Sequence, residues 1–186
     1  MRQKKKEKGN LEKLKLLTPE EDSKTIPEKY RGIYTDKTEI FNKMIEERGS
    51  YFLYGGPGTG KTVLAYSVMR WCLTNGANVK MINYPAFLIG MRRGFSEGKD
   101  AYGYADELAR FNGLLIIDDL GAEKATDFVR EITYYIINER DVHMRKVLIT
   151  SNYDLEEIDN QIDRRLSSRI VGMCKVIKFD GEDRRI

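Results

Sequence analysis

Apolar stretches and helical periodicities alternate along most of the chain. Short runs of apolar residues predict strands at 51–54, 78–83, 113–119, 146–150 and 175–179. Apolar positions at helical spacing predict helices at 38–47, from 63 onward, between 85 and 111 with interruptions at Gly94, Gly98 and Gly103, and at 128–140. Strands that alternate with helices are typical of an α/β fold, with a parallel sheet of about five strands and helices on both of its faces.

The first predicted strand leads directly into a glycine-rich loop and a helix. The loop matches the pattern G-x-x-x-x-G-K-[ST], and its residues are Gly55, Gly56, Pro57, Gly58, Thr59, Gly60, Lys61 and Thr62, with Val63 opening the helix. Glycines let successive backbone N–H groups point into one concavity, where the amino end of the helix adds positive partial charge. Such a loop holds a polyphosphate, with Lys61 reaching the β- and γ-phosphates and the Thr62 hydroxyl coordinating Mg²⁺. We therefore expect the chain to bind a nucleoside triphosphate.

The predicted strand at 113–119 ends in two adjacent carboxylates, Asp118 and Asp119. In doubly wound sheets, ligands bind outside the carboxyl ends of the strands, which is where these acids lie. We expect Asp118 to hold Mg²⁺ together with Thr62, and Asp119 to polarise an attacking water. Glu123 is a second candidate for the base, although it can equally cap the amino end of the following helix.

The strand at 146–150 is followed by Ser151 and Asn152, which should lie at the same end of a parallel sheet as the two acids. An amide at this place can hydrogen-bond both the γ-phosphate and the attacking water. Asn152 can also simply begin a turn, a common role for asparagine. The spacing alone does not separate these two interpretations.

A stripe of apolar residues at helical spacing follows, made of Ile158, Ile162, Leu166 and Ile170. On an ideal helix, Arg165 and Arg169 lie on or beside this stripe, one turn from each other. Guanidinium groups near an apolar face need an anionic partner, because an isolated buried charge is very costly. The partner is either a carboxylate of the same chain or a phosphate across a subunit boundary.

Composition is consistent with one globular domain in the cytoplasm. The chain has 186 residues, of which 41% are hydrophobic and 33% are charged. No apolar stretch approaches the roughly twenty residues that span a bilayer, and the first residues lack the apolar core of a signal peptide. Cys72 and Cys174 are separate thiols and His143 is a single histidine, so neither a disulfide framework nor a zinc site is expected.

Charge divides the chain into two parts. The net charge is only +3, yet seven lysines and arginines crowd residues 1–15. Basic segments of this kind are usually solvated and disordered, and contact with nucleic acid is the alternative. A polar stretch with proline and acidic residues follows from Thr18 to Pro27. We expect residues 1–29 to form a basic tail and linker and residues 30–186 to form the folded domain.

Taken together, these motifs resemble those of the AAA+ ATPases, a class of P-loop NTPases. The likeness is greatest to the bacterial helicase loaders of the DnaC/DnaI type and to the related IstB transposition ATPases. It rests on Gly55–Thr62, Leu115–Asp119, Thr150–Asn152 and Arg165–Arg169 in this order, together with the segments at 26–31 and 117–123. The resemblance implies an AAA+ core with a reduced or absent helical lid, since little chain follows the last predicted strand. The N-terminal module with which loaders grip the helicase is expected to be missing, shortened to the basic tail, or carried by another polypeptide.

The resemblance also assigns roles to individual residues. Asn152 corresponds to the sensor asparagine, and Arg169 to an arginine finger that acts on a neighbouring subunit's nucleotide, with Arg165 supporting the contact. Either Arg184 or Arg185 would be a second sensor that contacts the nucleotide. With Lys61 and Asp119, these residues imply a self-stimulated ATPase that uses ATP and Mg²⁺.

The resemblance further places a DNA-contacting insertion after the second strand. This stretch contains basic and aromatic residues, namely Arg92, Arg93 and Lys99 with Phe87, Phe95, Tyr102 and Tyr104. Basic groups for phosphates and rings for bases suit single-stranded DNA. Alternatively, Phe87 and Phe95 belong to the core and the charges are solvated.

The implied function is a helicase loader in DNA replication that assembles as a ring or open helix on single-stranded DNA. Two alternatives remain open at this point: an IstB-like transposition helper with a transposase partner, and a small-molecule P-loop kinase. A monomeric kinase has no need of Asn152 or of the Arg165/Arg169 pair in this arrangement.

Overall fold

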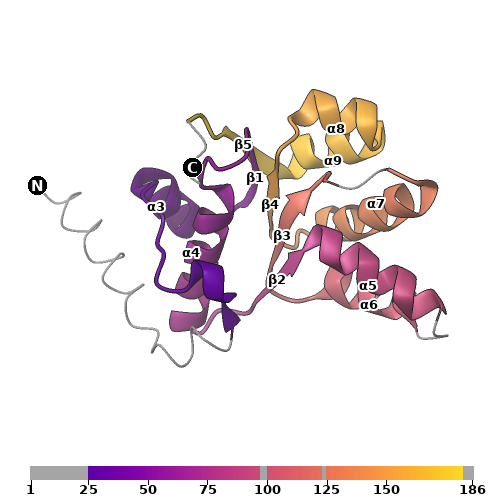
Figure 1. Cartoon of the computed structure of the whole chain (residues 1–186), viewed down its shortest axis with the longest axis horizontal. Helices are drawn as coiled ribbons and strands as arrows, with labels where there is room; N and C mark the ends of the chain where they lie inside the picture. Colours follow the sequence, from indigo (N-terminus) through magenta and orange to yellow (C-terminus); the bar gives the residue numbers. More distant parts are fainter. Residues whose placement is uncertain (1–24, 97–99, 123–124, 182–186) are drawn as a thin grey trace, which may run out of the picture.

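A parallel sheet forms the centre of the computed structural model, which describes residues 25–96, 100–122 and 125–181 (Figure 1). Within those ranges its strands are β1 Ser50–Tyr54, β2 Val79–Asn83, β3 Leu114–Leu120, β4 Val147–Ser151 and β5 Cys174–Lys178. Their order is β2-β3-β4-β1-β5, and each neighbouring pair is parallel. The predicted five-stranded parallel sheet is thus confirmed.

Helices cover both faces of the sheet, as expected. They are η1 Glu28–Tyr30, α3 Thr38–Glu47, α4 Lys61–Thr74, α5 Tyr84–Ser96, α6 Ala101–Arg110, α7 Asp127–Val142, α8 Leu155–Gln161 and α9 Arg164–Met173. Helices α3 and α4 lie on one face, and α5 to α9 lie on the other (Figure 1). No helix in the described ranges is both long enough and apolar enough to cross a membrane.

Side chains of successive strand residues enter two separate cores. Ile116 and Leu148 pack under α3 and α4, whereas Ile117 and Ile149 pack under α5 to α9. This alternation follows from the period of two along a strand. Because both faces are covered, the central strands read as continuous apolar runs, which is why the sequence revealed them so clearly.

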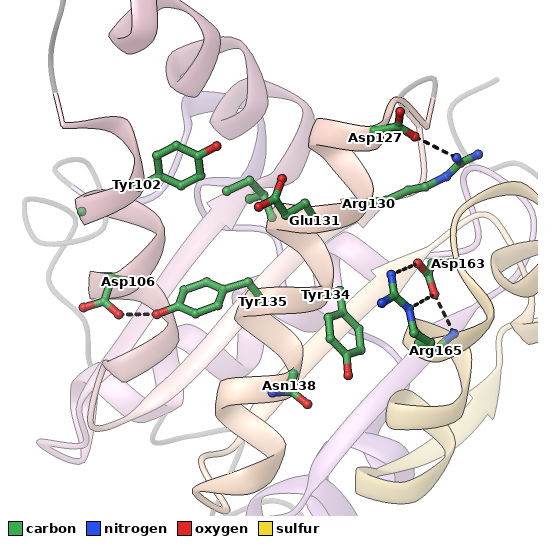
Figure 2. Close-up of a pocket in the computed structure, with 12 residues that line it drawn as sticks. Tyr102, Asp106, Asp127, Arg130, Glu131, Tyr134, Tyr135, Asn138, Asp163 and Arg165 are labelled. Carbon is green, nitrogen blue, oxygen red and sulfur yellow. Dashed lines mark hydrogen bonds and ion pairs between the residues drawn. The ribbon is translucent and has the colours of Figure 1, made fainter.

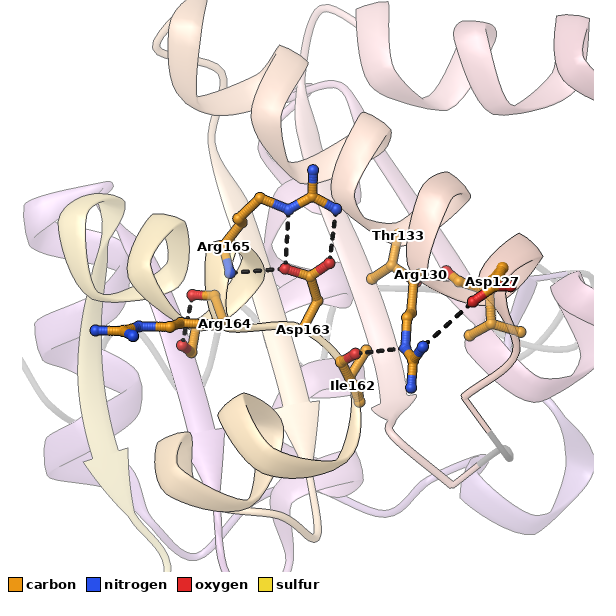
Figure 3. Close-up of polar contacts among 9 residues, drawn as sticks. Asp127, Arg130, Thr133, Ile162, Asp163, Arg164 and Arg165 are labelled. Carbon is orange, nitrogen blue, oxygen red and sulfur yellow. Dashed lines mark hydrogen bonds and ion pairs between the residues drawn. The ribbon is translucent and has the colours of Figure 1, made fainter.

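The apolar stripe near the end of the chain lies on two helices, not on the single ideal helix used in the sequence analysis. Ile162 closes α8, and Asp163 starts α9 by accepting a 2.7 Å hydrogen bond from the Arg165 N–H. The Ile162 carbonyl, which the break leaves free, accepts a 2.8 Å hydrogen bond from Nε of Arg130 on α7 (Figure 3). All four residues of the stripe are nevertheless buried.

Two further boundaries differ from the sequence expectations. Ile26 is only 2% exposed and packs with α3 and α4, so the core includes a residue that the sequence assigned to the linker. Helix α5 runs through Gly94 without interruption, and α6 contains Gly103. A side chain at position 103 would meet the Asp100 carboxylate, which caps α6 by accepting from the Gly103 N–H at 2.7 Å. Gly98 lies outside the described residues.

Candidate nucleotide-binding site

The phosphate-binding loop joins β1 to α4 at the carboxyl end of the sheet. Gly58 and Gly60 have φ angles of 73° and 98°, a conformation that glycine adopts without strain. Gly60 is the N-cap of α4, and no side chain caps that helix. The first N–H groups of α4 therefore remain available to an anion. This backbone arrangement fits a polyphosphate.

Gly55 is required for a different reason, because the backbone directly after β5 leaves no space for a side chain at this position. A β-carbon at this position would lie 2.2 Å from the carbonyl oxygen of Phe179, and the φ angle is 140°. The Phe179 N–H donates to the Tyr54 carbonyl at 2.7 Å, which fixes the loop against the edge strand. Glycine at position 55 thus permits the loop to leave β1 beside β5.

Lys61 lies inside the loop and is only 7% exposed. Its Nζ donates to the carbonyl oxygens of Gly55 at 2.7 Å and Gly56 at 2.8 Å, and to Oδ1 of Asn152 at 3.1 Å. The ammonium group is therefore held at the mouth of the loop, where phosphate oxygens would approach it. The contact with Asn152 joins the loop to the end of β4.

Thr62 and Asp118 meet across the site, as the sequence predicted. The Thr62 hydroxyl donates to Oδ1 of Asp118 at 2.9 Å, and the same oxygen accepts a 2.7 Å hydrogen bond from the Thr150 hydroxyl. Asp118 is 6% exposed, and this burial raises the pKa of its carboxyl, while the two hydroxyl donors oppose the shift. A buried carboxylate beside a threonine hydroxyl is a donor set that suits Mg²⁺, which favours oxygen ligands.

Asp119 and Asn152 are brought together at the ends of β3 and β4. Nδ2 of Asn152 donates to Oδ1 of Asp119 at 3.2 Å, so this amide bridges Lys61 and Asp119. Asp119 has a left-handed backbone with φ of 65°, at an irregularity in the register between β3 and β4. This conformation is uncommon outside glycine, although aspartate and asparagine tolerate it better than most residues. The contacts of Asn152 favour a place in the site over a mere turn.

Thr150 is the residue that sequence reasoning left without a role. Besides its bond to Asp118, its hydroxyl oxygen accepts from the backbone N–H of Asp119 at 2.9 Å. It therefore orients both acids at once. The available signal was a hydroxyl directly after the apolar run Val147–Ile149, at a position that is almost fully buried.

Residues 40–186 match the model of the family described as IstB-like ATP binding protein. This chain belongs to the IstB-like family. The match includes every site residue described above, from the phosphate-binding loop to Asn152.

The individual proteins that this chain resembles have low sequence identity to it. The replicative helicase loader DnaC of Escherichia coli (strain K12) is 25% identical over 122 residues, which are 65% of this chain and 49% of that protein. The chain thus spans about half the length of this curated relative. By structure, a crystal structure of the DnaC helicase loader superposes with a TM-score of 0.71 at 21% identity, over 83% of this chain and all of that one. The replication initiator DnaA, bound to AMPPCP and single-stranded DNA, gives a TM-score of 0.69 at 18% identity, over 84% of this chain and 51% of that one. These likenesses show an AAA+ P-loop fold.

In this IstB-like protein the two arginines of the predicted subunit contact both pair with carboxylates of their own chain. Arg165 forms a fork with Asp163, at 2.8 Å between Nη2 and Oδ2, and its guanidinium lies 4.7 Å from the centre of the Tyr134 ring (Figures 2 and 3). Nη1 of Arg169 donates to Oδ2 of Asp141 at 3.0 Å. Tyr134 and Asp141 both belong to α7, and each raises the pKa of Arg169, Tyr134 more strongly. The intramolecular partners considered from the sequence are thus present.

Both side chains nevertheless remain accessible, at 67% exposure for Arg165 and 41% for Arg169. The recorded partners of Arg169 in the described part of the chain lie on α7, on the side of the sheet away from α4. Arg165 also lines a cleft of about 890 Å³ between α6, α7 and the start of α9 (Figure 2). Both arginines that line this cleft are paired with acidic side chains of the same cleft, Arg130 with Asp127 and Arg165 with Asp163.

The remaining predicted residues divide into two groups. Glu123, Arg184, Arg185 and Lys99 lie outside the described residues, as does the side chain of Phe95. Arg92 and Arg93 are exposed on α5, whereas Phe87 is buried between Tyr84 and Tyr104. Phe87 is therefore a core residue, which was the alternative interpretation. Tyr102 lines the cleft of Figure 2.

Proposed function

We propose that this protein hydrolyses ATP, assembles with itself on single-stranded DNA, and loads a replicative helicase. The observation that carries the proposal is the chain of contacts from Lys61 through Asn152 to Asp119, which joins the phosphate-binding loop to the ends of β3 and β4. A structural loop has no need of this connection, whereas hydrolysis requires phosphate, water and base within one space. The match to the family of IstB-like ATP binding proteins and the likeness to DnaC support the same function.

Each residue then has a chemical task. The loop N–H groups and Lys61 bind the phosphates. Thr62 and Asp118 would hold Mg²⁺, which would supply positive charge to the phosphates. Asp119 accepts the proton of the attacking water. Asn152 orients that water and the γ-phosphate.

The base assignment is tested by Asp119→Asn, which keeps the left-handed backbone because asparagine tolerates it. The variant should bind ATP with nearly unchanged affinity and lose turnover, since an amide cannot accept the proton. Lys61→Ala should instead weaken ATP binding, because it removes a direct counter-charge of the phosphates. Equilibrium binding of nucleotide and release of phosphate are measured on both. Turnover of Asp119→Asn at the wild-type rate would exclude Asp119 as the base and make Glu123 the candidate.

We further propose that Arg169 acts on the nucleotide of a neighbouring subunit. Arginine fingers accelerate phosphoryl transfer by about a thousandfold or more. Arg169→Ala should therefore leave ATP binding intact and abolish the extra hydrolysis that appears on assembly.

Mixed assemblies give the sharper test. Arg169→Ala subunits combined with Lys61→Ala subunits should recover some activity, because some contacts then pair an intact loop with an intact arginine. Lys43 is an exposed lysine on α3. The Lys43→Ala variant is the control, and it should change neither ATP binding nor hydrolysis. If mixed assemblies form and stay inactive, Arg169 acts within its own chain or supports structure only.

For DNA, we propose that Arg92 and Arg93 contact phosphates in the assembled form. Their exposure on α5 supports this proposal. Arg92→Ala with Arg93→Ala should weaken single-stranded DNA binding and lower its log–log salt dependence by about 0.7 per lost contact. Basal hydrolysis should stay unchanged. Loss of all binding on deletion of residues 1–15, with normal binding by the arginine variants, would assign the DNA contact to the tail.

A transposition helper is the second candidate, and the description of the family as IstB-like favours it. This function uses the same site residues, so the two candidates differ in the partner. Purification of the protein from its native host separates them, because a loader should bring down a helicase and a helper a transposase. A kinase is excluded if phosphate appears with no acceptor other than water.

A further inference from the structure

A second cavity opens at the amino end of the strands, opposite the nucleotide-binding site. It has a volume of about 890 Å³ and lies where α3 and α4 end and where β1 to β4 begin. Its apolar wall includes Ile45, Tyr51, Trp71 and Leu148. We refer to it as the basic pocket, because its charged lining residues are Arg48, Arg145 and Lys146.

The lining of the basic pocket carries charge of one sign. Among the described residues that line it there is no aspartate or glutamate, and His143 adds a further basic group. Two carboxylates beside the lining residues in the sequence are already engaged, each with at least one basic or hydroxyl group. Glu47 pairs with Lys175 at 2.7 Å and with the Tyr51 hydroxyl, and Glu139 lies 3.6 Å from His143.

Arg145 is half-buried, and one atom of its guanidinium group lacks a hydrogen-bond partner in the described part of the chain. Its Nη1 atom is buried and has no hydrogen-bond partner within the described residues. A buried donor without an acceptor is energetically unfavourable, because it has lost its hydrogen bond to water. The positive charge of Arg145, together with the larger effect of burial, also lowers the pKa of nearby Arg140 to about 10. A ligand with negative charge and a hydrogen-bond acceptor would therefore complement the pocket.

The rim of the pocket is apolar and exposed. Met144, which lines the pocket, is 81% exposed, and Val142, at the end of α7, is 59% exposed. Large apolar side chains that lie exposed beside a concave site mark protein contacts more often than small-molecule sites, which enclose their ligands. The occupant should therefore be a macromolecular segment with both apolar and acidic side chains.

We propose that the basic pocket binds an acidic peptide segment of a partner protein, with an apolar side chain inserted against Trp71 and carboxylates at Arg145 and Lys146. We infer an acidic partner because the pocket is basic, and we infer a protein because the rim of the pocket is apolar and exposed. This binding is independent of nucleotide, because the phosphate-binding loop lies at the other end of the strands. A partner can therefore be held throughout a cycle of ATP binding and hydrolysis.

The experiment uses Trp71, which is the only tryptophan of the chain and lies in the pocket. Its fluorescence is titrated, in the full chain without nucleotide, with a short synthetic peptide of glutamates and leucines at helical spacing. One control peptide has lysines in place of glutamates, and another has serines in place of leucines. Only the first peptide should give a saturable change. Equal binding of the serine peptide, or no saturable change with any peptide, would overturn the proposal.

Variants locate the binding. Arg145→Gln with Lys146→Gln should weaken binding about tenfold or more, as expected for loss of charge-assisted contacts. The matched control, Lys29→Gln with Lys43→Gln, removes the same charge outside the pocket and should change affinity less than twofold. Met144→Glu, at an exposed position that leaves the core intact, should also weaken binding about tenfold by repulsion.

Three other results would overturn the proposal. Unchanged peptide affinity with lowered stability in the Arg145/Lys146 variant means that these cations only balance the helix C-termini nearby. A single-stranded oligonucleotide that quenches Trp71 with the same dependence on Arg145 and Lys146, where the peptide fails, means a nucleic-acid site. Concentration-dependent dimerisation that the Met144→Glu variant abolishes, without peptide binding, means an interface between copies of this chain.

Discussion

The two ends of the strands bury charge in different ways. At the carboxyl end, Lys61 and Asp118 bond to hydroxyls, to an amide and to loop carbonyls that a nucleotide and its metal can replace. At the amino end, Arg140 is fully buried and donates to carbonyl oxygens at 2.6–3.4 Å, namely those of Leu108, Ala109, Phe111, Gly113 and Lys146. A bound ligand can replace the hydrogen bonds of Lys61 and Asp118, whereas those of Arg140 lie in the core and belong to the fold itself.

This difference indicates which end of the strands contributes more to the stability of the fold. Arg140 joins the end of α6 to the beginnings of β3 and β4, so removing it leaves several backbone acceptors unpaired at once. The carboxyl end keeps a raised pKa at Asp118, which means that its charge opposes folding until a cation compensates it. We therefore expect substitutions at the amino end to affect stability, and polar substitutions at the carboxyl end to affect ligand binding.

The largest effect should come from Arg140→Met, which fills much of the same space but donates no hydrogen bond. We expect a loss of about 3–5 kcal/mol in the free energy of unfolding, because buried carbonyls then lack their donor. Urea denaturation followed by circular dichroism measures this loss. Arg164→Met, at an exposed position on α9, is the control and should stay within about 0.5 kcal/mol of the wild type. A loss below about 1 kcal/mol at Arg140 would remove the contrast between the two ends.

Gly55→Ala tests whether the carboxyl end contains any position that stability requires. The new methyl group would collide with the Phe179 carbonyl, and alanine is strained at a φ angle of 140°. We expect a loss of about 1–3 kcal/mol. The neighbouring Gly56→Ala is the matched control, since nothing lies within 4 Å of a β-carbon at that position. Equal losses in the two variants would show that the contact of the loop with β5 has no special role.

The smallest effect is expected from Asp118→Asn, and its sign is opposite. The asparagine oxygen can accept from Thr62 and Thr150 as before, but it carries no buried charge. Without Mg²⁺ and nucleotide at pH 7, we expect the variant to be more stable by about 0.5–2 kcal/mol. Binding of Mg²⁺ with nucleotide should fall sharply, and titration calorimetry measures that loss.

The pH dependence checks the physical cause. A raised pKa of an acid in the folded state means that ionisation opposes folding, and this penalty appears as the pH rises above the ordinary value of 3.8. The stability difference between wild type and Asp118→Asn should therefore be small near pH 4 and grow toward pH 7. A difference that stays constant over this range would attribute it to packing instead of charge.

The sequence predicted the residues at the carboxyl ends of the strands much better than those at the amino ends. The loop from Gly55 to Thr62 and the acids after β3 follow from local patterns, in which each residue type has a defined geometric task. The burial of Arg140 has no local signal, because its acceptors lie elsewhere in the sequence, as for Leu108 at a separation of 32 residues. Arginine is also mostly an exposed residue, so burial is not the default expectation.

The remaining differences have a similar origin. The restart of the helix at Asp163 depends on Arg130, which is distant in sequence and holds the Ile162 carbonyl. The packing of Ile26 depends on α3 and α4, and the nearby carbonyls of Tyr30 and Ile33 are held by buried Arg70. In each case a tertiary contact sets the boundary, where the local pattern indicated only a continuing helix or a linker.

The left-handed backbone of Asp119 limits how this position can change over evolutionary time. Most residues are strained at positive φ, whereas asparagine and glycine are not greatly so. If Asp119 is the base proposed above, a descendant that loses hydrolysis but keeps the fold should carry asparagine or glycine at position 119, and seldom valine or leucine. Asparagine at this position would preserve nucleotide binding and the hydrogen bond from the Asn152 amide. Such a lineage would become a nucleotide-dependent switch by a single substitution, with no rebuilding of the sheet.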